Sequence, residues 1–152
     1  MPLMDLTFPA GAIDAGARAG LIDDLTTALL RAERAPDTDF FRSITWVFVN
    51  ELPADNVYAA GRPVEAPIAR LIVTTPDGAL SDRRRAEMVE AATQLIRDAL
   101  GIAEADALTR IWVVHRTVAD GSWGAGGQVV RFSQLRELAA REREQAAAPA
   151  GD

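Results

Sequence analysis

A faint internal repeat constrains the fold of this 152-residue chain more than any other feature of its sequence. Four residues recur in the same order 66 positions later, as residue 27 does at 93 and residue 46 at 112. A repeat dictates architecture, because each copy folds as one structural unit. We therefore predict two similar units side by side, over residues 2–50 and 68–116. The recurring pairs are Thr27 and Thr93, Leu29 and Leu95, Arg31 and Arg97, and Trp46 and Trp112.

Each unit reads as strand, helix, strand. Asp14 and Ser81 each precede a stretch with apolar residues at helical spacing, and their side chains can cap the helix that follows. Each strand–helix–strand passage is long enough for a parallel right-handed crossover. The sequence therefore predicts an α/β fold in which two tandem βαβ units form a four-stranded sheet with both helices on one face. The expected strands cover residues 3–8, 44–49, 69–75 and 111–114.

The segments outside the repeat are expected to form turns and a C-terminal extension. Residues 53–67 are rich in proline and glycine and are interpreted as a loop or hairpin. Four glycines lie within residues 121–127, just before two valines, which indicates a C-terminal hairpin. Residues 133–145 have the pattern of a surface helix. We expect a single domain over residues 1–135, followed by a C-terminal helix and a frayed tail over residues 136–152.

The expected sheet has more apolar surface than two helices can cover. A strand that is apolar on both faces is normally buried on both. Three subunits that pack with their sheets inward would cover the face without helices, so we expect a homotrimer. The two faces of the second expected strand read Ile44, Trp46 and Phe48, and Thr45, Val47 and Val49.

Composition narrows the classes of function. The formal net charge of -6 argues against general affinity for nucleic acid or an anionic membrane. The sequence has no cysteine and one histidine, His115, so disulfides and thiolate sites are excluded and a metal site would rest on carboxylates alone. No apolar run approaches the roughly 18–20 residues that span a bilayer, and no secretory signal is evident. We expect a cytoplasmic protein that uses no metal or other cofactor and binds a small molecule.

The opening Met1-Pro2-Leu3, joined to two βαβ units, resembles the tautomerase superfamily, whose members are similar to 4-oxalocrotonate tautomerase. More narrowly, the chain resembles the double-length members of the malonate semialdehyde decarboxylase and cis-3-chloroacrylic acid dehalogenase groups. Residues 52–57 and 111–113 are similar to the dehalogenase group, and residues 122–126 to the decarboxylase group. The resemblance covers roughly residues 2–135. It implies a tautomerase or isomerase that acts on an enol, a 2-oxo acid or a related small molecule, or an enzyme with a related proline-dependent lyase, hydration or dehalogenation activity.

The sequence departs from both groups just after the third expected strand. There the two groups carry arginines that hold the substrate carboxylate, whereas this chain reads Thr74-Thr75-Pro76-Asp77-Gly78. Neither named reaction therefore carries over. We expect carboxylate substrates to be handled poorly unless another arginine compensates, and Arg70 and Arg116 are the candidates because strands display them in fixed directions.

The resemblance implies that Pro2 is the catalytic group once Met1 is removed. The secondary amine of an N-terminal proline titrates, whereas the nitrogen of an internal proline is an inert amide. An ordinary α-amino group has a pKa of about 7.7–8, and an apolar pocket lowers it, so Pro2 could act as a general base or as a general acid. The alternative for Pro2 is a proline that merely follows the start codon. The alternative for the whole chain is a non-enzymatic, ferredoxin-like βαββαβ module that binds a small molecule or a partner chain.

Several further residues have both a functional and a structural interpretation. Asp39 falls where the decarboxylase group carries a functional aspartate, and could orient a water or tune Pro2; it could equally cap a turn, and Asp37 competes for the role. Trp123 either forms a wall of the active site or packs against a neighbouring subunit. The run of arginines at 83–85 is expected to be a solvated face, although it lies at a helix N-terminus, where the helix dipole disfavours cations. His115 is expected at the surface or at an interface.

Overall fold

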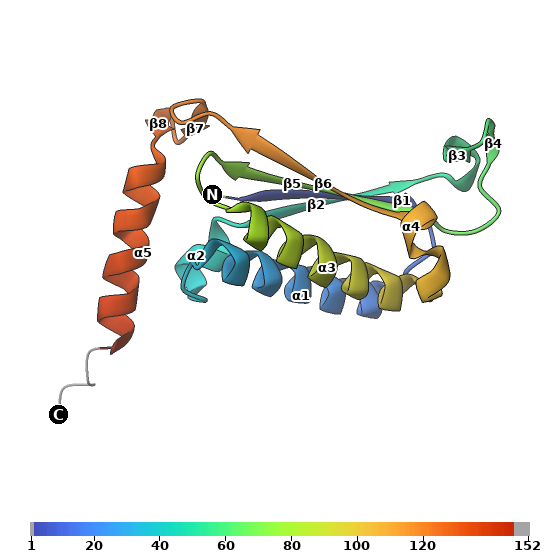
Figure 1. Ribbon diagram of the computed structural model, residues 1–152, viewed down its shortest axis with the longest axis horizontal. Helices are drawn as coiled ribbons and strands as arrows, with labels where there is room; N and C mark the ends of the chain where they lie inside the picture. The colour runs from blue at the N-terminus through green and yellow to red at the C-terminus, as the bar shows by residue number, and fades with distance from the viewer. Residues whose placement is uncertain (1, 148–152) are drawn as a thin grey trace.

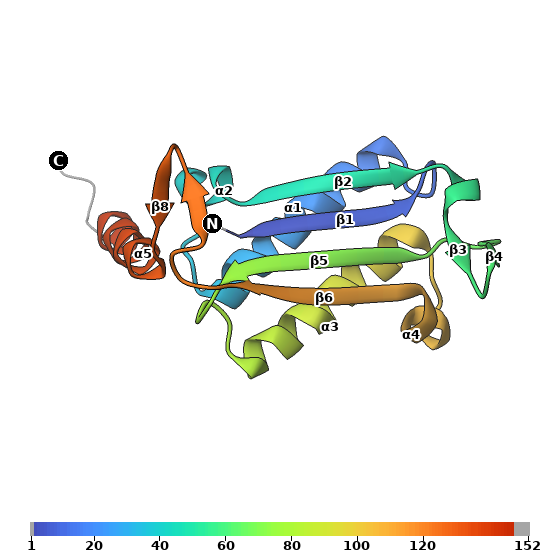
Figure 2. The same cartoon turned by 90° about the horizontal axis from the view of Figure 1, so that it is seen from above.

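The computed structural model describes residues 2–147, and its centre is a four-stranded sheet of order β2-β1-β5-β6. Strands β1 and β2 are parallel, β5 and β6 are parallel, and β1 and β5 are antiparallel neighbours. Figures 1 and 2 show helices α1 and α3 lying side by side under one face of this sheet. The predicted α/β fold of two tandem βαβ units is confirmed. The four strands are β1 (Leu3–Pro9), β2 (Trp46–Leu52), β5 (Ala69–Pro76) and β6 (Ile111–Val118).

The two long helices begin where their predicted caps stand. In α1 (Ala15–Glu33) the Asp14 carboxylate accepts hydrogen bonds from the backbone N–H groups of Gly16 and Ala17, both at 2.9 Å. In α3 (Asp82–Leu100) the Ser81 hydroxyl accepts from the backbone N–H of Arg84 at 3.4 Å. Each cap satisfies a backbone donor that has no partner within its helix.

The second strand begins at Trp46, two residues later than predicted. A short helix, α2 (Asp39–Ser43), precedes it, and Ile44 closes that helix instead of opening the strand. The Thr38 hydroxyl caps α2 by accepting from the backbone N–H of Phe41 at 3.4 Å. The sequence pattern missed α2 because five residues are too few to show helical periodicity.

The remaining segments form two small hairpins and a C-terminal helix. The predicted hairpins are both present, and residues 126 and 127 form the tight turn of the second one, where both glycines have positive φ. Residues 146 and 147 belong to α5 instead of the predicted frayed tail, whereas residues 148–152 lie outside the described residues. No described helix is long and apolar enough to cross a membrane. These elements are β3 (Tyr58–Ala59), β4 (Arg62–Pro63), η1 (Ala54–Asn56), η2 (Glu104–Asp106), α4 (Ala107–Arg110), β7 (Trp123–Ala125), β8 (Gln128–Val130) and α5 (Phe132–Ala147).

The repeat is real, but its offset is not uniformly 66. The two long helices begin at 15 and 82, and their left-handed C-caps are Arg34 (φ 57°) and Gly101 (φ 63°), so α1 and α3 superpose with an offset of 67. The buried residues agree: Leu21, Leu25 and Leu29 correspond to Met88, Ala92 and Ile96. Only β2 and β6 match at 66, through Trp46 and Trp112. The connection from helix to strand is thus one residue shorter in the second unit, and the Thr27–Thr93 and Leu29–Leu95 identities are not structural equivalents.

The core lies between the sheet and the two helices, and the opposite face of the sheet is open. Met4, Leu6 and Phe8 of β1 are at most 1% exposed and point toward the helices. On the helix-free face Trp46 is 61% exposed and Trp112 63% exposed. The prediction that both faces are apolar holds only in part: the helix-free face carries Trp46, Phe48, Trp112 and Val114, but also Asp5, Arg70 and Arg116. The single chain covers only the other face.

Candidate active site at the start of strand β1

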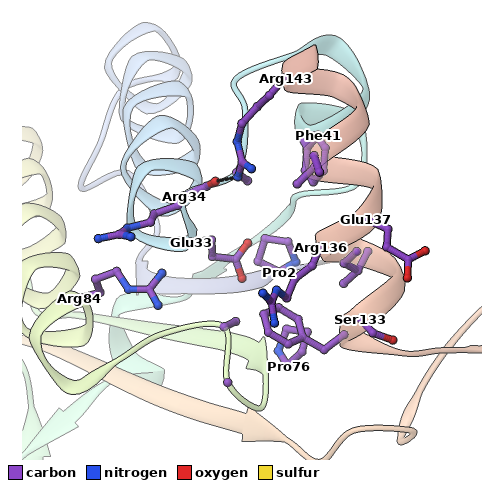
Figure 3. Close-up of a pocket in the computed structure, with 17 residues that line it drawn as sticks. Pro2, Glu33, Arg34, Phe41, Pro76, Arg84, Ser133, Arg136, Glu137 and Arg143 are labelled. Carbon is purple, nitrogen blue, oxygen red and sulfur yellow. Dashed lines mark hydrogen bonds between the residues drawn. The ribbon is translucent and has the colours of Figure 1, made fainter. Parts of the chain in front are cut away.

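Pro2 is buried at the beginning of β1, in the wall of a cavity of about 710 Å³. Its carbonyl oxygen accepts a hydrogen bond from the backbone N–H of Trp46 at 3.2 Å, which fixes Pro2 in line with the sheet. Side chains alternate along a strand, so Pro2 shares the helix-facing side with Met4. The ring therefore points into the space where the helices end (Figure 3).

Five elements that are distant in the sequence enclose this cavity. They are the first strand, the C-terminal end of α1, the short helix α2, the turn between β5 and α3 with the start of α3, and the C-terminal helix α5. Figure 3 shows α5 standing across the opening from α1, with Phe41 of α2 between them. The same stretch that lacks the expected arginines, residues 74–78, contributes Pro76 and Gly78 to the wall.

The position of α5 is fixed by packing and by hydrogen bonds. Ala139 packs with Leu30 and Phe41 in a small apolar cluster that is separate from the main core. At the start of the helix, the Asp120 carboxylate accepts from the backbone N–H of Phe132 at 2.9 Å, and this bond lowers the pKa of Asp120. Helix α5 is therefore held as part of the cavity wall.

Glu33, the last residue of α1, brings a carboxyl group into the cavity. Figure 3 shows it between Pro2 and Arg84. Burial raises the pKa of Glu33 from 4.5 to about 7, against the opposing influence of the N-terminal ammonium and the Arg84 guanidinium. This carboxyl group can therefore take up or release a proton near neutral pH.

Arginines give the cavity positive charge on two sides. The Arg84 Nη1 donates to the carbonyl oxygen of Ala32 at 3.1 Å, and its Nε donates to the Ser81 hydroxyl at 3.3 Å. Arg84 is thus held between the end of α1 and the start of α3. Arg136 reaches in from α5 and points toward Pro2 (Figure 3). The prediction that residues 83–85 form a solvated face is therefore wrong for Arg84, which lies in the wall of the cavity.

Asp39 does not reach this cavity within the chain. It is the exposed first residue of α2, and Phe41, two residues later, lines the cavity instead. Asp37 pairs with the Arg42 guanidinium at 2.6 Å, and the hydrogen bond from Arg42 lowers the pKa of Asp37.

The other candidates, Arg70, Arg116 and Trp123, also lie outside the cavity. Arg70 pairs in register with Thr7, roughly 17 Å along β1 from Pro2 at about 3.3 Å per residue. Arg116 is exposed on β6, two strands from β1. Trp123 is half-buried at the start of β7. A role for these three at Pro2 requires that a neighbouring subunit supply them, and it stays a prediction.

His115 is half-buried on β6, and its ring lies beside Arg85 of α3. Both of its ring nitrogens are buried, and burial lowers the pKa of the imidazole. Within residues 2–147 no three or more His, Asp or Glu side chains gather as they would around a metal ion.

The sequence did carry a signal for the two charged residues that were missed. Anions are disfavoured at the C-terminus of a helix and cations at its N-terminus. Glu33 ends α1 and Arg84 lies in the first turn of α3, so both stand at the unfavourable end of their helix.

Comparison with known proteins gives a match only at the level of structure. No family model matches the sequence, and no curated protein matches it. A crystal structure of Pt0534 inactivated by 2-oxo-3-pentynoate superposes with a TM-score of 0.72 at 17% identity, covering 87% of this chain and 98% of that one. An asymmetric trimer of wild-type F6 fused 4-OT superposes with a TM-score of 0.69 at 22% identity, covering 90% of this chain and 98% of that one. N1, a member of the cis-3-chloroacrylic acid dehalogenase family, superposes with a TM-score of 0.69 at 21% identity, covering 97% of this chain and 92% of that one. The chain has the fold of the tautomerase superfamily, in its double-length form.

Proposed function

We propose that the chain is an enzyme that moves a proton on a small enol or 2-oxo acid, with the secondary amine of Pro2 as a catalytic group after removal of Met1. The observation that carries the proposal is the placement of Pro2, buried at the start of β1 in the wall of a cavity of about 710 Å³. An amine in that position can transfer a proton to or from carbon. The structural neighbours include Pt0534 inactivated by 2-oxo-3-pentynoate and a member of the cis-3-chloroacrylic acid dehalogenase family, which supports this reaction class.

Arg84 and Arg136 are proposed to bind the negative part of the substrate, in place of the arginines that the double-length groups carry after the third strand. Both line the cavity, and Arg84 is already fixed by bonds to Ala32 and Ser81. A hydrogen bond to a charged group contributes about 1.5–3 kcal/mol. With this arrangement we expect carboxylate substrates to bind well, contrary to the expectation from the sequence, because the anion site is supplied by α3 and α5 instead of by the end of β5.

The catalytic form is proposed to be a homotrimer. The helix-free face of the sheet exposes Trp46 and Phe48 on β2, and Trp112 and Val114 on β6. Clustered large apolar side chains at a surface are typical of an interface. Several structural neighbours are described as trimers. Three chains packed through this face would also bring the strand residues Arg70 and Arg116 near neighbouring subunits.

The proposal is tested by following the ketonisation of the enol of an aromatic 2-oxo acid by its ultraviolet absorbance. Intact mass first establishes that Met1 is absent. We expect turnover by this protein and a loss of 10²- to 10⁴-fold on Pro2→Ala, the usual range for a general acid or base. A preparation that retains Met1 serves as the matched control, because its Pro2 nitrogen is an amide. Full activity in that control would refute a catalytic Pro2, and no turnover of any such acid by the processed protein would favour the binding module.

A further inference from the structure

We propose that Glu33 is a second catalytic group of the same cavity, which takes a proton from the substrate while the amine of Pro2 delivers one. The inference rests on the proposed function of Pro2 and names its partner. The two residues come from different elements, the end of α1 and the start of β1, yet both line one cavity.

The geometry favours a shared task over a structural role for Glu33. In Figure 3 its carboxylate is directed into the cavity beside the Pro2 ring, whereas Glu137, the other glutamate in the wall, points away from Pro2. A structural carboxylate would be expected to pair with the arginines around it. Arg84 instead donates to Ala32 and Ser81.

The charged surroundings of Glu33 are mostly positive, so its anion is supported when it forms. Burial keeps the pKa of Glu33 at about 7, close to the pKa of about 7.7–8 of an ordinary α-amine. Two such groups in one cavity titrate as a pair that can hold one proton between them near neutral pH. The titratable and charged groups that face it are Pro2 at the start of β1, Arg34 next to it in the chain, Arg84 from α3, and Arg136 and Arg143 from α5. Glu137 of α5 lines the cavity but points away, and α2 contributes the uncharged Phe41.

The proton balance of an enol-to-ketone step is complete with these two groups. The Glu33 carboxylate accepts the proton of the enol hydroxyl as the carbonyl forms, and the Pro2 ammonium donates a proton to the carbon. The substrate thus gains one proton at carbon and loses one at oxygen. Transfer of the proton from the Glu33 carboxyl to the neutral Pro2 amine then restores both groups, and no further reactant is needed.

The composition of the chain allows the amine to be observed directly. The sequence contains neither cysteine nor lysine, so the N-terminal amine is its only aliphatic amine and no thiol competes for an alkylating agent. Iodoacetamide is a neutral probe: the free amine displaces iodide, and the proton leaves with it. The alkylation rate, followed by intact mass and peptide mapping, reports the fraction of neutral Pro2 at each pH without any turnover.

The experiment compares the processed wild-type protein with Glu33→Gln and with the matched control Glu137→Gln, by alkylation between pH 5 and 9 and by turnover. A nearby anion favours the ammonium form of Pro2. We therefore expect Glu33→Gln to move the alkylation midpoint to lower pH, with faster labelling around and above pH 7, where the wild-type carboxyl group is ionised. Turnover should fall by 10²-fold or more and lose one limb of its pH profile. Glu137→Gln should change neither.

The outcomes separate this inference from the proposed function. A wild-type protein with no turnover, or with turnover that Pro2→Ala leaves intact, contradicts the proposed function itself. Turnover that depends on Pro2 but survives in Glu33→Gln, with an unmoved midpoint, overturns the role of Glu33 alone. Glu33→Asp keeps the negative charge on a side chain that is one methylene shorter. This variant should retain the alkylation midpoint of Pro2 and lose part of the turnover. If Glu33→Gln does not fold, an unmoved pH profile in Glu33→Asp at full rate would equally overturn the proposal.

Discussion

Replacement of Trp46 by alanine should weaken the proposed trimer far more than it weakens the folded chain. Trp46 is 61% exposed on the helix-free face of the sheet, at 6.4 Å from the Phe48 ring in an edge-to-face contact. A tryptophan offers roughly 250 Å² of surface, so about 150 Å² of Trp46 remains for an interface to cover. At about 25 cal/mol per Å², that burial is worth up to about 3 kcal/mol per subunit after allowance for the remaining methyl group.

The effect on assembly is multiplied by three, because a trimer contains three copies of the contact. Area overestimates binding energy, so we take about 1.5–3 kcal/mol per copy, or about 4.5–9 kcal/mol per trimer. The concentration at half assembly scales with the square root of a three-body dissociation constant. It should therefore rise by roughly 50- to 2,000-fold, since about 1.4 kcal/mol is a factor of ten.

Sedimentation velocity over a wide concentration range measures this midpoint. The matched control is Leu108→Ala, because Leu108 is 85% exposed on α4, away from the sheet face, and should leave the midpoint unchanged. Trp112→Ala should behave like Trp46→Ala, since Trp112 is 63% exposed on the same face. An unchanged midpoint in both tryptophan variants, or a wild-type monomer at micromolar concentration, would refute assembly through this face.

Three further predictions concern the cavity. Arg84→Ala should reduce kcat/KM for an enolisable monoacid by about ten- to a hundredfold, because a charge-assisted hydrogen bond of about 1.5–3 kcal/mol is lost. The same substitution should leave kcat/KM for the neutral ester nearly unaffected. Equal losses for the acid and the ester would contradict an anion-binding role. Phe41→Ala should destabilise the chain by about 3–5 kcal/mol, because this 5%-exposed ring joins α2 to α5, and denaturant unfolding would show it; a loss below about 1 kcal/mol would mean that α5 does not depend on the cluster. The free energy of unfolding should fall as pH rises from 4.5 to about 7, because folded Glu33 holds its proton in that window and the unfolded chain does not, and Glu33→Gln should remove that fall. A pH dependence that is identical in wild type and Glu33→Gln would show that burial does not act on this carboxyl group.

The fold could be predicted from the sequence because its signals are local and periodic. The caps Asp14 and Ser81 and the apolar stripes behind them fixed both helices within a residue of their true starts. The predicted offset of the repeat is wrong by one residue in the helices, because Thr27 and Thr93 are a chance identity, whereas the buried positions of α1 and α3 align with an offset of 67. Helix α2 escaped prediction because a single turn has no period to detect.

The cavity could be predicted only in part, because its walls come from segments whose approach is tertiary. Nothing near residue 33 in the sequence indicates that α5, about 100 residues later, will face it across the cavity. That approach is set by the β7–β8 hairpin, by the bond from the Phe132 N–H to Asp120, and by the packing of Ala139 on Phe41. Pro2 could be proposed from the sequence, because the chemistry expected of it depends only on its being second, and the structure places it in the cavity wall. Arg136 was not, because a surface helix has many arginines and the pattern does not say which one turns inward.

Glu33 and Arg84 both violate the preference for anions at helix N-termini and cations at helix C-termini, and both lie in the candidate site. A charge at the unfavourable end of a helix loses about 0.3–1 kcal/mol when it is exposed. Glu33 loses more, because burial also disfavours its anion and raises its pKa to about 7. The unfavourable charges of Glu33 and Arg84 lie at the same place in the structure, because Arg84 donates to the carbonyl oxygen of Ala32, the residue before Glu33. Two unfavourable charges of opposite sign that meet at one cavity, beside the buried Pro2, are hard to explain by stability alone. The proposed site, which holds a proton at Glu33 and binds an anion at Arg84, would account for both.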